Sequence, residues 1–272
     1  LSDRRQRQMC IRDRFYVIGN KTSKSLSPTI FNHWFKKYNI NAKYDFLELS
    51  VKTFDKKINA IKKEKDVFGI NITIPFKQKI IKHTKVLDKH AKKIKAVNCL
   101  TLRPTNKGSN TDWMGYLNSL PKDKNLKEEN IILIGYGGAA LAIHYLFKQK
   151  GCKKINIFNR TKRKIRYETK TKYTINLNQI KKYLPSATLI VNTTPLNPLN
   201  KEEIDLIEKK TTISDIVYSP KQTNFLKKFP KNEKIFGISM LIEQAVISFE
   251  LWFGFKPKVD LKLKKLLDKK IK

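Results

Sequence analysis

Residues 130–151, NIILIGYGGAALAIHYLFKQKG, constrain the fold of this chain more than any other segment. An apolar run that is typical of a buried strand leads directly into a glycine-rich turn, and the helix-forming stretch that follows ends at Gly151. Gly135, Gly137 and Ala140 have the spacing G-x-G-x-x-A. This spacing allows a tight turn, a close approach of a pyrophosphate to the backbone, and close packing of the helix on the strand. The segment predicts a dinucleotide-binding βα unit; an ordinary βα turn with spare glycines is the alternative.

The next expected strand, within residues 154–161, ends in a polar and basic tip. A site that prefers NAD places Asp or Glu there to bind the ribose hydroxyls. This chain instead has Asn159, Arg160 and Thr161, and Lys164 follows closely. Cationic and hydroxyl side chains suit a 2′-phosphate, so the sequence predicts NADP as the cofactor. A solvated loop in a lysine-rich chain is the alternative.

The rest of the chain alternates between strand-like and helix-like segments. Strands are expected within residues 15–20, 43–50, 68–76, 96–104, 154–161, 187–195 and 211–220. Helices are expected from an N-cap at Ser27 with Pro28 in the first turn, over 51–67, over 77–95, and from Ser239 to 254. The alternation predicts an α/β fold with a mostly parallel sheet that helices cover.

The stretch FGINITIPFKQ, residues 68–78, separates apolar and polar residues at a period of two. The apolar set is Ile70, Ile72, Ile74 and Phe76, and the other set is Asn71, Thr73, Pro75 and Lys77. Strands that are covered on both faces tend to be apolar throughout. The polar face therefore predicts a strand end beside a cleft.

Other polar residues fall at comparable places, because Ser25 and Ser27 follow the first strand, Asn98 lies in AVNCL and Asp112 lies in NTD. Ligands of open α/β sheets bind outside the carboxyl ends of the strands. Each residue alone has a simpler role: Ser27 or Asp112 as a helix cap, Asn98 as a turn former, and Lys77 as a surface lysine. Their joint placement favours a ligand site.

These residues, in this order, resemble the shikimate dehydrogenase family. The matching stretches are SKSLSP, NITIPFK, AVNCL, NTD, GYGGAA, NRT, VNTTP, DIVY and GISMLIEQA. The resemblance covers about residues 15–256. With the βα alternation, it predicts an N-terminal substrate domain over 15–116 and a Rossmann-type NADP domain over 117–237, with a cleft between them. Helices within 238–272 are expected to return to the first domain.

The resemblance also implies roles for individual residues. Lys77 and Asp112 are the expected catalytic pair. The expected substrate-binding residues are Ser25, Ser27, Asn71, Thr73, Lys77, Asn98, Asp112, Tyr218 and Gln244. The expected cofactor-binding residues are Gly135, Tyr136, Gly137, Gly138, Ala139, Asn159, Arg160, Thr161, Lys164, Thr193, Ile216 and Gly237. The implied activity is the reversible, NADPH-dependent reduction of 3-dehydroshikimate to shikimate, on the route to chorismate and the aromatic amino acids, and no metal is expected.

Three places depart from the family pattern. Trp113 and Ser239 stand where glycine is usual, and Lys24 and Leu26 flank the serines where His and Lys are often seen. None of these removes a group with an implied chemical role. Trp113 could narrow the cleft, so a relative that acts on quinate or another cyclic hydroxy acid, with NADP or NAD, is the alternative function.

The chain of 272 residues has a formal net charge of +35. Its lysines are spread along the sequence rather than gathered in one block, which favours a compositional bias over a nucleic-acid surface. A basic nucleic-acid-binding protein is the distant alternative. The expected partners are a small-molecule substrate, no nucleic acid and no membrane, and the expected assembly is a monomer or a homodimer.

The start of the chain, LSDRRQRQMCIRDR (residues 1–14), holds five of the nine arginines and predicts an extension foreign to the family, such as a tag. A nucleic-acid-binding arm is the alternative. The three cysteines form no close pair, which predicts reduced thiols and a cytoplasmic location. No run approaches the roughly 20 apolar residues of a membrane span, and none near the start resembles a secretory signal.

Overall fold

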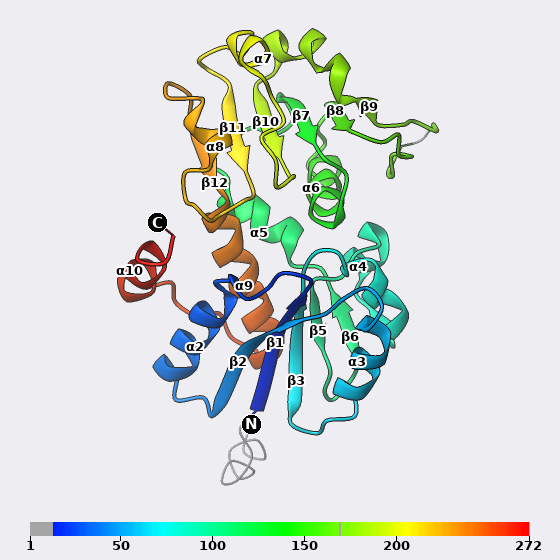
Figure 1. The fold of residues 1–272 in the computed structure, drawn as a ribbon, viewed down its shortest axis with the longest axis vertical. Coiled ribbons are helices and arrows are strands. Elements are labelled where there is room, and N and C mark those ends of the chain that lie inside the picture. The colour runs from blue at the N-terminus through cyan, green and yellow to red at the C-terminus, as the bar shows by residue number, and fades with distance from the viewer. Residues whose placement is uncertain (1–12, 169, 272) are drawn as a thin grey trace. The chain divides into compact units, whose positions relative to one another are not determined.

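The computed structural model describes residues 13–168 and 170–271. They form two compact units, each with its own sheet (Figure 1). The first unit runs to Thr111 and resumes over Ala245–Lys270, and the second contains Asp112–Gln244. The limits predicted from the sequence, 15–116 and 117–237, differ from this division, because the second unit begins at Asp112 and extends to Gln244.

The first unit is built on a six-stranded sheet in the order β2-β1-β3-β5-β6-β4. The strands are β1 (Asp13–Gly19), β2 (Ala42–Glu48), β3 (Val67–Ile72), β4 (Val86–Leu87), β5 (Cys99–Thr101) and β6 (Lys107–Ser109). The β1–β2, β1–β3 and β4–β6 pairs are parallel, whereas β3–β5 and β5–β6 are antiparallel. The expected mostly parallel sheet is confirmed, but the sequence did not predict β6 or the antiparallel hairpin that it forms with β5.

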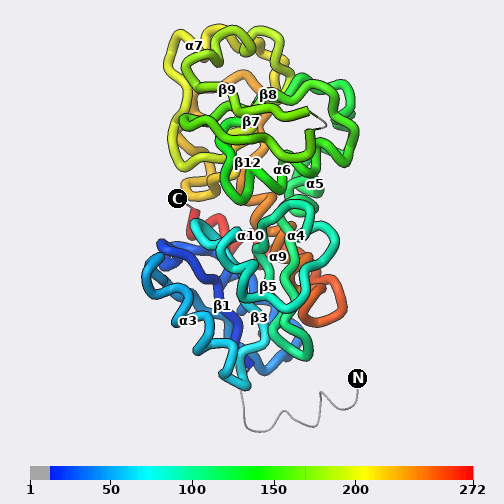
Figure 2. Tube along the Cα trace, turned by 90° about the vertical axis from the view of Figure 1, so that its right-hand side faces the viewer, coloured from blue at the N-terminus to red at the C-terminus, as the bar shows by residue number. Residues whose placement is uncertain are grey.

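Helices cover both faces of this sheet (Figure 2). On one face, α2 (Ser27–Lys37) and the C-terminal part of α9 (Gly237–Phe253) build an aromatic core around Phe31, Trp34 and Phe249. On the other face, α3 (Phe54–Ile61) and α4 (Lys89–Ile94) pack with the aliphatic residues of β1 and β3. The last helix, α10 (Leu261–Asp268), contacts α2 through an ion pair of Asp260 with Lys37.

Three local predictions for this unit are wrong. β1 begins at Asp13, so Arg14 is part of the sheet rather than of the odd start, and its guanidinium pairs with Asp66 and Glu64; the residues before Asp13 lie outside the described part. The N-cap of α2 is Leu26 and not Ser27, and it makes no side-chain capping bond. The stretch 77–95 is not one helix, because Asp88 caps a separate α4 after a 3-10 turn, η1 (Lys79–His83), and the short β4.

The polar-faced strand is also shorter than predicted. β3 ends at Ile72, and Ile74 has 58% of its surface exposed instead of lying on the apolar face. Pro75 cannot donate to a strand ladder, and the chain turns before it to bury Phe76. Thr73 and Lys77 therefore lie in a connecting turn directly after the strand.

The second unit has a six-stranded, fully parallel sheet in the order β12-β11-β10-β7-β8-β9. The strands are β7 (Asn130–Ile134), β8 (Lys154–Asn159), β9 (Ile175–Asn176), β10 (Leu189–Asn192), β11 (Thr212–Asp215) and β12 (Lys234–Phe236). The chain moves outward in opposite directions from β7 and β10, which creates a switch point between these two neighbouring strands. The Rossmann-type fold that the glycine motif predicted is confirmed.

Helices again lie on both faces. α5 (Asp112–Ser119) and α6 (Gly138–Gln149) share one apolar cluster with β7, which includes Ile131, Leu133 and Ile143. The other face is covered by two 3-10 segments, η2 (Leu177–Lys182) and η3 (Leu184–Ser186), and by α8 (Asn224–Lys227). The short α7 (Lys201–Asp205) begins with a capping box between Asn200 and Glu203.

Candidate active site

The polar residues that the sequence selected in the first unit gather at one edge of its sheet. β1 and β3 are parallel, and the turns that follow them touch, because the Thr73 amide donates to Ile18 O (2.8 Å) and the Asn20 amide donates to Ile74 O (3.1 Å). Asn98 lies at the same edge, because it precedes the antiparallel β5 and its carbonyl accepts from the Ile72 amide (2.8 Å). The connections that carry Ser25, Thr73 and Lys77 therefore leave the sheet at this edge, and Asn98 lies in the segment before β5. Ser27 begins α2 after the first connection, and Asn71 lies one residue before the end of β3.

A carboxylate holds the loop that carries the two serines. Glu48 Oε1, at the end of β2, accepts from the backbone amides of Thr22 (2.7 Å) and Ser23 (2.8 Å). Hydrogen bonds from Ser23 and Thr22 lower the pKa of Glu48, so the carboxylate stays ionised. Because Leu26 takes the cap position, the hydroxyl of the buried Ser27 is not used to cap α2. The simpler reading of Ser27 as a helix cap is therefore excluded.

Asn71 belongs to a buried hydrogen-bond network. Its Oδ1 accepts from Tyr44 Oη (2.8 Å), and its Nδ2 donates to Asn98 O (3.1 Å) and Ser248 Oγ (3.0 Å). The Asn98 side chain completes the network, because Nδ2 donates to Thr111 Oγ1 (2.9 Å) and Oδ1 accepts from the Thr111 amide (2.6 Å). The Asn98–Thr111 pair fixes the backbone directly before Asp112, the first residue of the second unit.

Three members of the network, Thr111, Ser248 and Tyr44, were not predicted from the sequence. Thr111 lies between Asn110 and Asp112 in the NTD motif, so its place in this motif could have marked it. Ser248 lies four residues after Gln244 in α9, so the two side chains lie on the same face of the helix. No sequence pattern marks Tyr44 as the third partner of Asn71.

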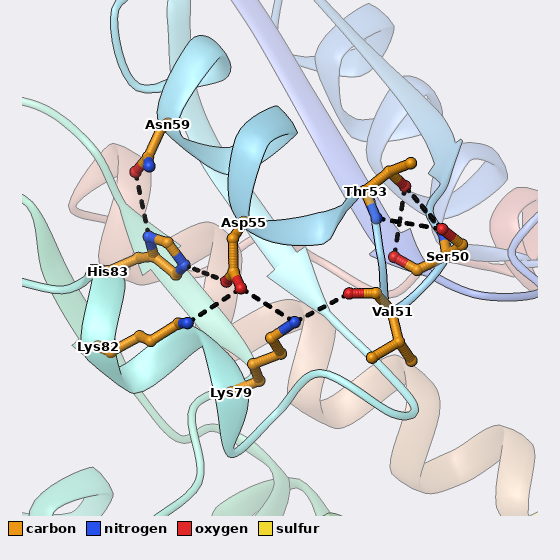
Figure 3. Close-up of polar contacts among 8 residues, drawn as sticks. All are labelled: Ser50, Val51, Thr53, Asp55, Asn59, Lys79, Lys82 and His83. Carbon is orange, nitrogen blue, oxygen red and sulfur yellow. Dashed lines mark hydrogen bonds and ion pairs between the residues drawn. The ribbon is translucent and has the colours of Figure 1, made fainter.

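The turn that carries Lys77 is anchored on both sides. Before it, the buried Phe76 stacks on Phe54 of α3 with the ring centroids 4.1 Å apart. The Lys77 carbonyl accepts from the Val97 amide (2.7 Å). After it, Lys79 Nζ donates to Val51 O (2.9 Å), as Figure 3 shows.

Asp55 of α3 ties down the 3-10 turn that follows Lys77 (Figure 3). Its carboxylate contacts His83 Nε2 (2.7 Å), Lys82 Nζ (3.0 Å) and Lys79 Nζ (3.1 Å). These contacts, led by the bond to His83, hold the pKa of Asp55 well below its usual range. The other ring nitrogen of His83 lies 3.2 Å from Asn59 Oδ1. The backbone that presents Lys77 is therefore fixed to α3.

The carboxyl edge of the second sheet collects the residues that the sequence assigned to the cofactor. Four of them come directly after a strand: Gly135 after β7, Thr193 after β10, Ile216 after β11 and Gly237 after β12. A fifth, Asn159, is the last residue of β8. The loops are joined at this edge, because the Gly135 amide donates to Phe158 O (2.8 Å) and Thr193 Oγ1 donates to Ile134 O (2.7 Å).

The glycine turn fits the demands of a pyrophosphate. Gly135 has φ +98°, and a Cβ there would lie 2.5 Å from Thr193 Oγ1, so both conformation and space require glycine. A Cβ on Gly137 would meet no atom within 4 Å, so open space lies above this residue. Gly137 is the N-cap of α6, and the first amides of a helix lack intrahelical partners. The turn therefore offers open backbone donors to an anion.

The tip of β8 presents cations to solvent. Asn159 is half-buried and its Nδ2 donates to Thr161 O (2.8 Å) and Thr161 Oγ1 (3.2 Å). Arg160 and Lys164 are exposed. Because β8 and β7 are parallel neighbours, this tip lies beside the glycine turn. The arrangement fits a cofactor that carries an extra phosphate.

The turn after β11 is held by a buried carboxylate. Asp215 accepts from Thr223 Oγ1 (2.6 Å), the Val217 amide (3.1 Å) and Asn192 Nδ2 (3.4 Å). Burial raises the pKa of Asp215, against the effect of these donors. The bonds fix the chain that leads to the half-buried Tyr218.

Two glycines set close approaches near the remaining predicted residues. A Cβ on Gly237 would overlap the Ile216 carbonyl, so this glycine lets the start of α9 lie against the β11 turn. A Cβ on Gly115 would lie 2.6 Å from Gln244 Cβ, so α5 and α9 pack closely where Gln244 lies. Asp112, the first residue of α5, is buried. Trp113 beside it packs edge-on against Tyr145 (5.7 Å).

Other features of the described residues lie apart from these edges. A cavity of about 530 Å³ is bordered by residues between 117 and 127 and by Lys150, and it includes no predicted site residue. Over the described ranges, no cluster of three or more His, Cys, Asp or Glu side chains could bind a metal ion. Within the same ranges, no helix has the length and apolar character to cross a membrane.

Family models match most of the chain. The shikimate dehydrogenase substrate-binding domain matches residues 17–100. The shikimate/quinate 5-dehydrogenase model matches residues 119–218, and the shikimate 5′-dehydrogenase C-terminal domain matches residues 237–266.

Similar proteins agree with these models. An NADP(+)-dependent shikimate dehydrogenase of Methanosphaera stadtmanae is 32% identical over 269 residues, which covers 92% of this chain and 95% of the relative. The crystal structure of shikimate dehydrogenase from Aquifex aeolicus matches with a TM-score of 0.80 and 30% identity, over 94% of this chain and 97% of that one. A shikimate dehydrogenase crystallised with NADP+ matches with a TM-score of 0.81 and 25% identity, over 96% of both chains. The family expected from the motifs is thus confirmed, and this chain belongs to the shikimate dehydrogenase family.

Proposed function

We propose that this protein catalyses the reversible reduction of 3-dehydroshikimate to shikimate with NADPH, a step toward chorismate and the aromatic amino acids. The observation that supports the proposal is that the connections with Ser25, Thr73 and Lys77 and the segment with Asn98 all lie at one edge of the first sheet, in a chain of this family. The reaction is the one that the names of the relatives state, and the assignments below give each residue a role in it.

We assign substrate binding to the polar groups of this edge and to two residues of the second unit. The serine hydroxyls suit a carboxylate, and the held backbone around Thr22 and Ser23 keeps their loop in place. Thr73 is the firmer contact of the polar strand, because both polar atoms of the Asn71 side chain are already bonded within the protein. Gln244 would contact a ring hydroxyl, and Tyr218 would line the same pocket.

We assign proton transfer to Lys77 with Asp112 as its partner. A ketone that is reduced to an alcohol needs a proton on its oxygen, and a positioned lysine can donate or accept that proton. The contacts of Phe76 with Phe54 and of Lys79 with Asp55 hold the backbone from which the Lys77 side chain extends. NADPH, when bound, supplies the hydride for the carbonyl carbon.

We assign NADP binding to the carboxyl edge of the second sheet. The amides of Gly137, Gly138 and Ala139 would bind the pyrophosphate at the start of α6. Arg160, Thr161 and Lys164 would bind the 2′-phosphate. Thr193, Ile216 and Gly237 would lie near the nicotinamide end, because they follow the three strands on the other side of β7.

The test is an absorbance assay at the NADPH band with purified protein, shikimate and NADP+. Lys77→Ala should lower kcat by roughly a hundredfold or more, because proton transfer by a positioned side chain contributes on that scale. NADP+ affinity, measured by calorimetry, should change little. Lys52→Ala removes an exposed lysine of the same unit and serves as the control. Unchanged turnover in Lys77→Ala would overturn the assignment of this lysine.

Two rival functions have separate signatures. Steady-state rates with quinate against shikimate, and with NAD+ against NADP+, separate a quinate-type relative from a shikimate enzyme. Higher kcat/KM with quinate would favour the rival. A nucleic-acid-binding protein would instead bind DNA or RNA with submicromolar, salt-steep affinity and show no dehydrogenase activity.

We further propose a cytoplasmic location and a monomer or homodimer. Within the described ranges, Cys99 and Cys152 are free thiols and both are buried, which fits a reducing compartment. Light scattering of the purified protein gives the assembly state. Cell fractionation against a cytoplasmic marker tests the location.

A further inference from the structure

The connection from β8 to β9 is unusual for a parallel sheet. Neighbouring parallel strands are normally joined through an α-helix. β8 and β9 are parallel neighbours, yet the described residues between them contain no helix. Residues 161–168 and 170–174 instead fold back on themselves, and we refer to them as the β8–β9 hairpin.

Backbone bonds close the base of the β8–β9 hairpin. The Ile165 amide donates to Lys172 O (2.8 Å), and the Thr174 amide donates to Arg163 O (2.8 Å). The buried Thr174 hydroxyl accepts from the Arg163 amide (2.9 Å) and donates to Thr161 O (3.3 Å). The hairpin is therefore a defined element, and it carries the exposed cations that follow Arg160.

The Tyr136 side chain joins this hairpin to the glycine turn. Tyr136 lies between Gly135 and Gly137, and its hydroxyl accepts from the Arg166 amide (2.9 Å). The same oxygen lies 3.3 Å from His144 Nδ1 on α6. One hydroxyl thus bridges the proposed pyrophosphate turn, the helix behind it and the hairpin.

The protonation of His144 fits this bridge. Burial lowers the pKa of His144 to about 4, so the ring is neutral at neutral pH. Its buried Nε2 makes no hydrogen bond among the described residues and lies 4.0 Å from Glu168 Oε1, so a ring proton on Nε2 faces a carboxylate and leaves Nδ1 as an acceptor. Burial also raises the pKa of Tyr136, so the phenol keeps its proton and donates it to Nδ1. Both hydrogen-bonding functions of the hydroxyl are used.

Further contacts press the hairpin against α6. Tyr167 adopts the left-handed backbone conformation (φ +67°), which is costly for a residue other than glycine. Its ring packs against His144 (5.3 Å) and Tyr145 (5.6 Å). Glu168 forms an ion pair with Lys148 (3.2 Å). The position of the hairpin is therefore set by α6 and the glycine turn.

We propose that Tyr136 is a positioning residue for cofactor selection, whose hydroxyl fixes the β8–β9 hairpin to the glycine turn so that the cations after β8 are held for the 2′-phosphate. The inference rests on the proposed assignment of Arg160 and its neighbours to that phosphate. NAD+ has no 2′-phosphate, so the two cofactors respond differently when the bridge is removed.

The test compares Tyr136→Phe with the wild type by calorimetric titration of NADP+ and of NAD+. Loss of one hydrogen bond of this kind should weaken NADP+ binding by about tenfold and NAD+ binding by less than about twofold. The KM for NADP+ should rise while kcat at saturating cofactor stays constant. Amide hydrogen exchange without cofactor should become faster in the hairpin. Tyr183→Phe, in which a half-buried ring packs on Phe158, is the control and should behave as wild type.

Equal weakening of NADP+ and NAD+ in Tyr136→Phe would show a general structural role and overturn the inference. Should that variant not fold, Glu168→Gln removes the hairpin's ion pair without touching the glycine turn and must shift NADP+ affinity in the same direction. Arg160→Ala distinguishes a failure of the cofactor-site assignment from a failure of the role proposed for Tyr136. If it leaves the NADP+ preference intact, the cofactor-site assignment fails; if it lowers the preference but Tyr136→Phe does not, only the role of Tyr136 fails.

Discussion

At the scale of single residues, buried polar side chains do most to define this molecule. Asn71 and Asn98 sit where an apolar strand would be expected, and their cost of burial is offset by bonds to Tyr44, Thr111 and Ser248. Such a network stabilises only one arrangement of the strand ends, because removing any member leaves buried partners unpaired. The network thus gives the edge that presents Thr73 and Lys77 a single geometry.

His144 gives the protein a pH-dependent stability. Its pKa is about 4 in the folded protein against 6.5 for the free side chain, because burial near Lys148 disfavours the charged ring and Glu168 only partly compensates. The contribution is fully present above the unfolded pKa and is lost as the pH falls toward the folded one. Between pH 7 and pH 4 the wild type should lose at most about 3 kcal/mol more than His144→Asn. The Asn variant keeps an acceptor for Tyr136.

Urea denaturation of both proteins at a series of pH values measures this difference. All other titrating groups are shared, so subtraction isolates His144. Parallel stability curves for the two proteins would mean that His144 is not neutral and buried in the folded state.

The sequence predicted which residues follow the strand ends better than it predicted the local surroundings of each side chain. The strand-end pattern predicted that the connections with Ser25 and Thr73 and the segment with Asn98 follow the ends of neighbouring strands, and the backbone has this arrangement. It could not show that Leu26 rather than Ser27 caps α2, because both residues occupy the first turn and only backbone geometry separates them. The exposed Ile74 escaped prediction because Pro75 ends the ladder inside an alternating pattern.

At the scale of elements, the two glycines of the β7–α6 turn separate folding from binding. Gly137→Ala has room for the new methyl group and should leave the melting temperature nearly unchanged, but the Cβ would fill the space above the turn and weaken NADP+ binding by roughly tenfold or more. Gly135→Ala meets Thr193 at a positive φ and should lower stability by about 1–3 kcal/mol.

Thermal unfolding and calorimetry with NADP+ check both variants. Each serves as the other's control, because the same methyl group is added two residues apart. If Gly137→Ala binds NADP+ as the wild type does, the cofactor does not approach the turn at that point.

Elements with a strong local sequence pattern were predicted, and elements whose structure depends on contacts with other elements were not. The β7–α6 unit matches the sequence prediction, because an apolar strand, a glycine turn and a helix reinforce one another. The stretch 77–95 has helical propensity throughout, yet the ion pairs of Asp55 and the pairing of β4 with β6 divide it. The β8–β9 hairpin depends on contacts with α6 that no local pattern encodes.

At the scale of the whole molecule, charge is the dominant property. The 58 basic residues exceed the 23 acidic ones by 35, and both the expected substrate and NADP are anions. Many lysines pair only with solvent-exposed carboxylates or with none of the described residues. They therefore add to the positive electrostatic field around the protein and little to the stability of the fold. Such a field raises the local concentration of small anions without specifying which anion binds.

This field predicts a particular salt dependence. Raising the ionic strength from 0.01 to 0.1 M shortens the Debye length from about 30 to about 10 Å, so long-range attraction is screened while buried contacts are not. We expect kcat/KM for shikimate to fall several-fold, on the order of the steering effects seen in charged clefts, with kcat unchanged. Initial rates at low shikimate across a series of sodium chloride concentrations, at saturating NADP+, measure the slope.

Arg160→Ala should keep that slope for shikimate, because one charge among 58 hardly alters the total field. A kcat/KM independent of salt would mean that the lysines are too well screened or too scattered to guide the substrate, and that their abundance has no part in catalysis.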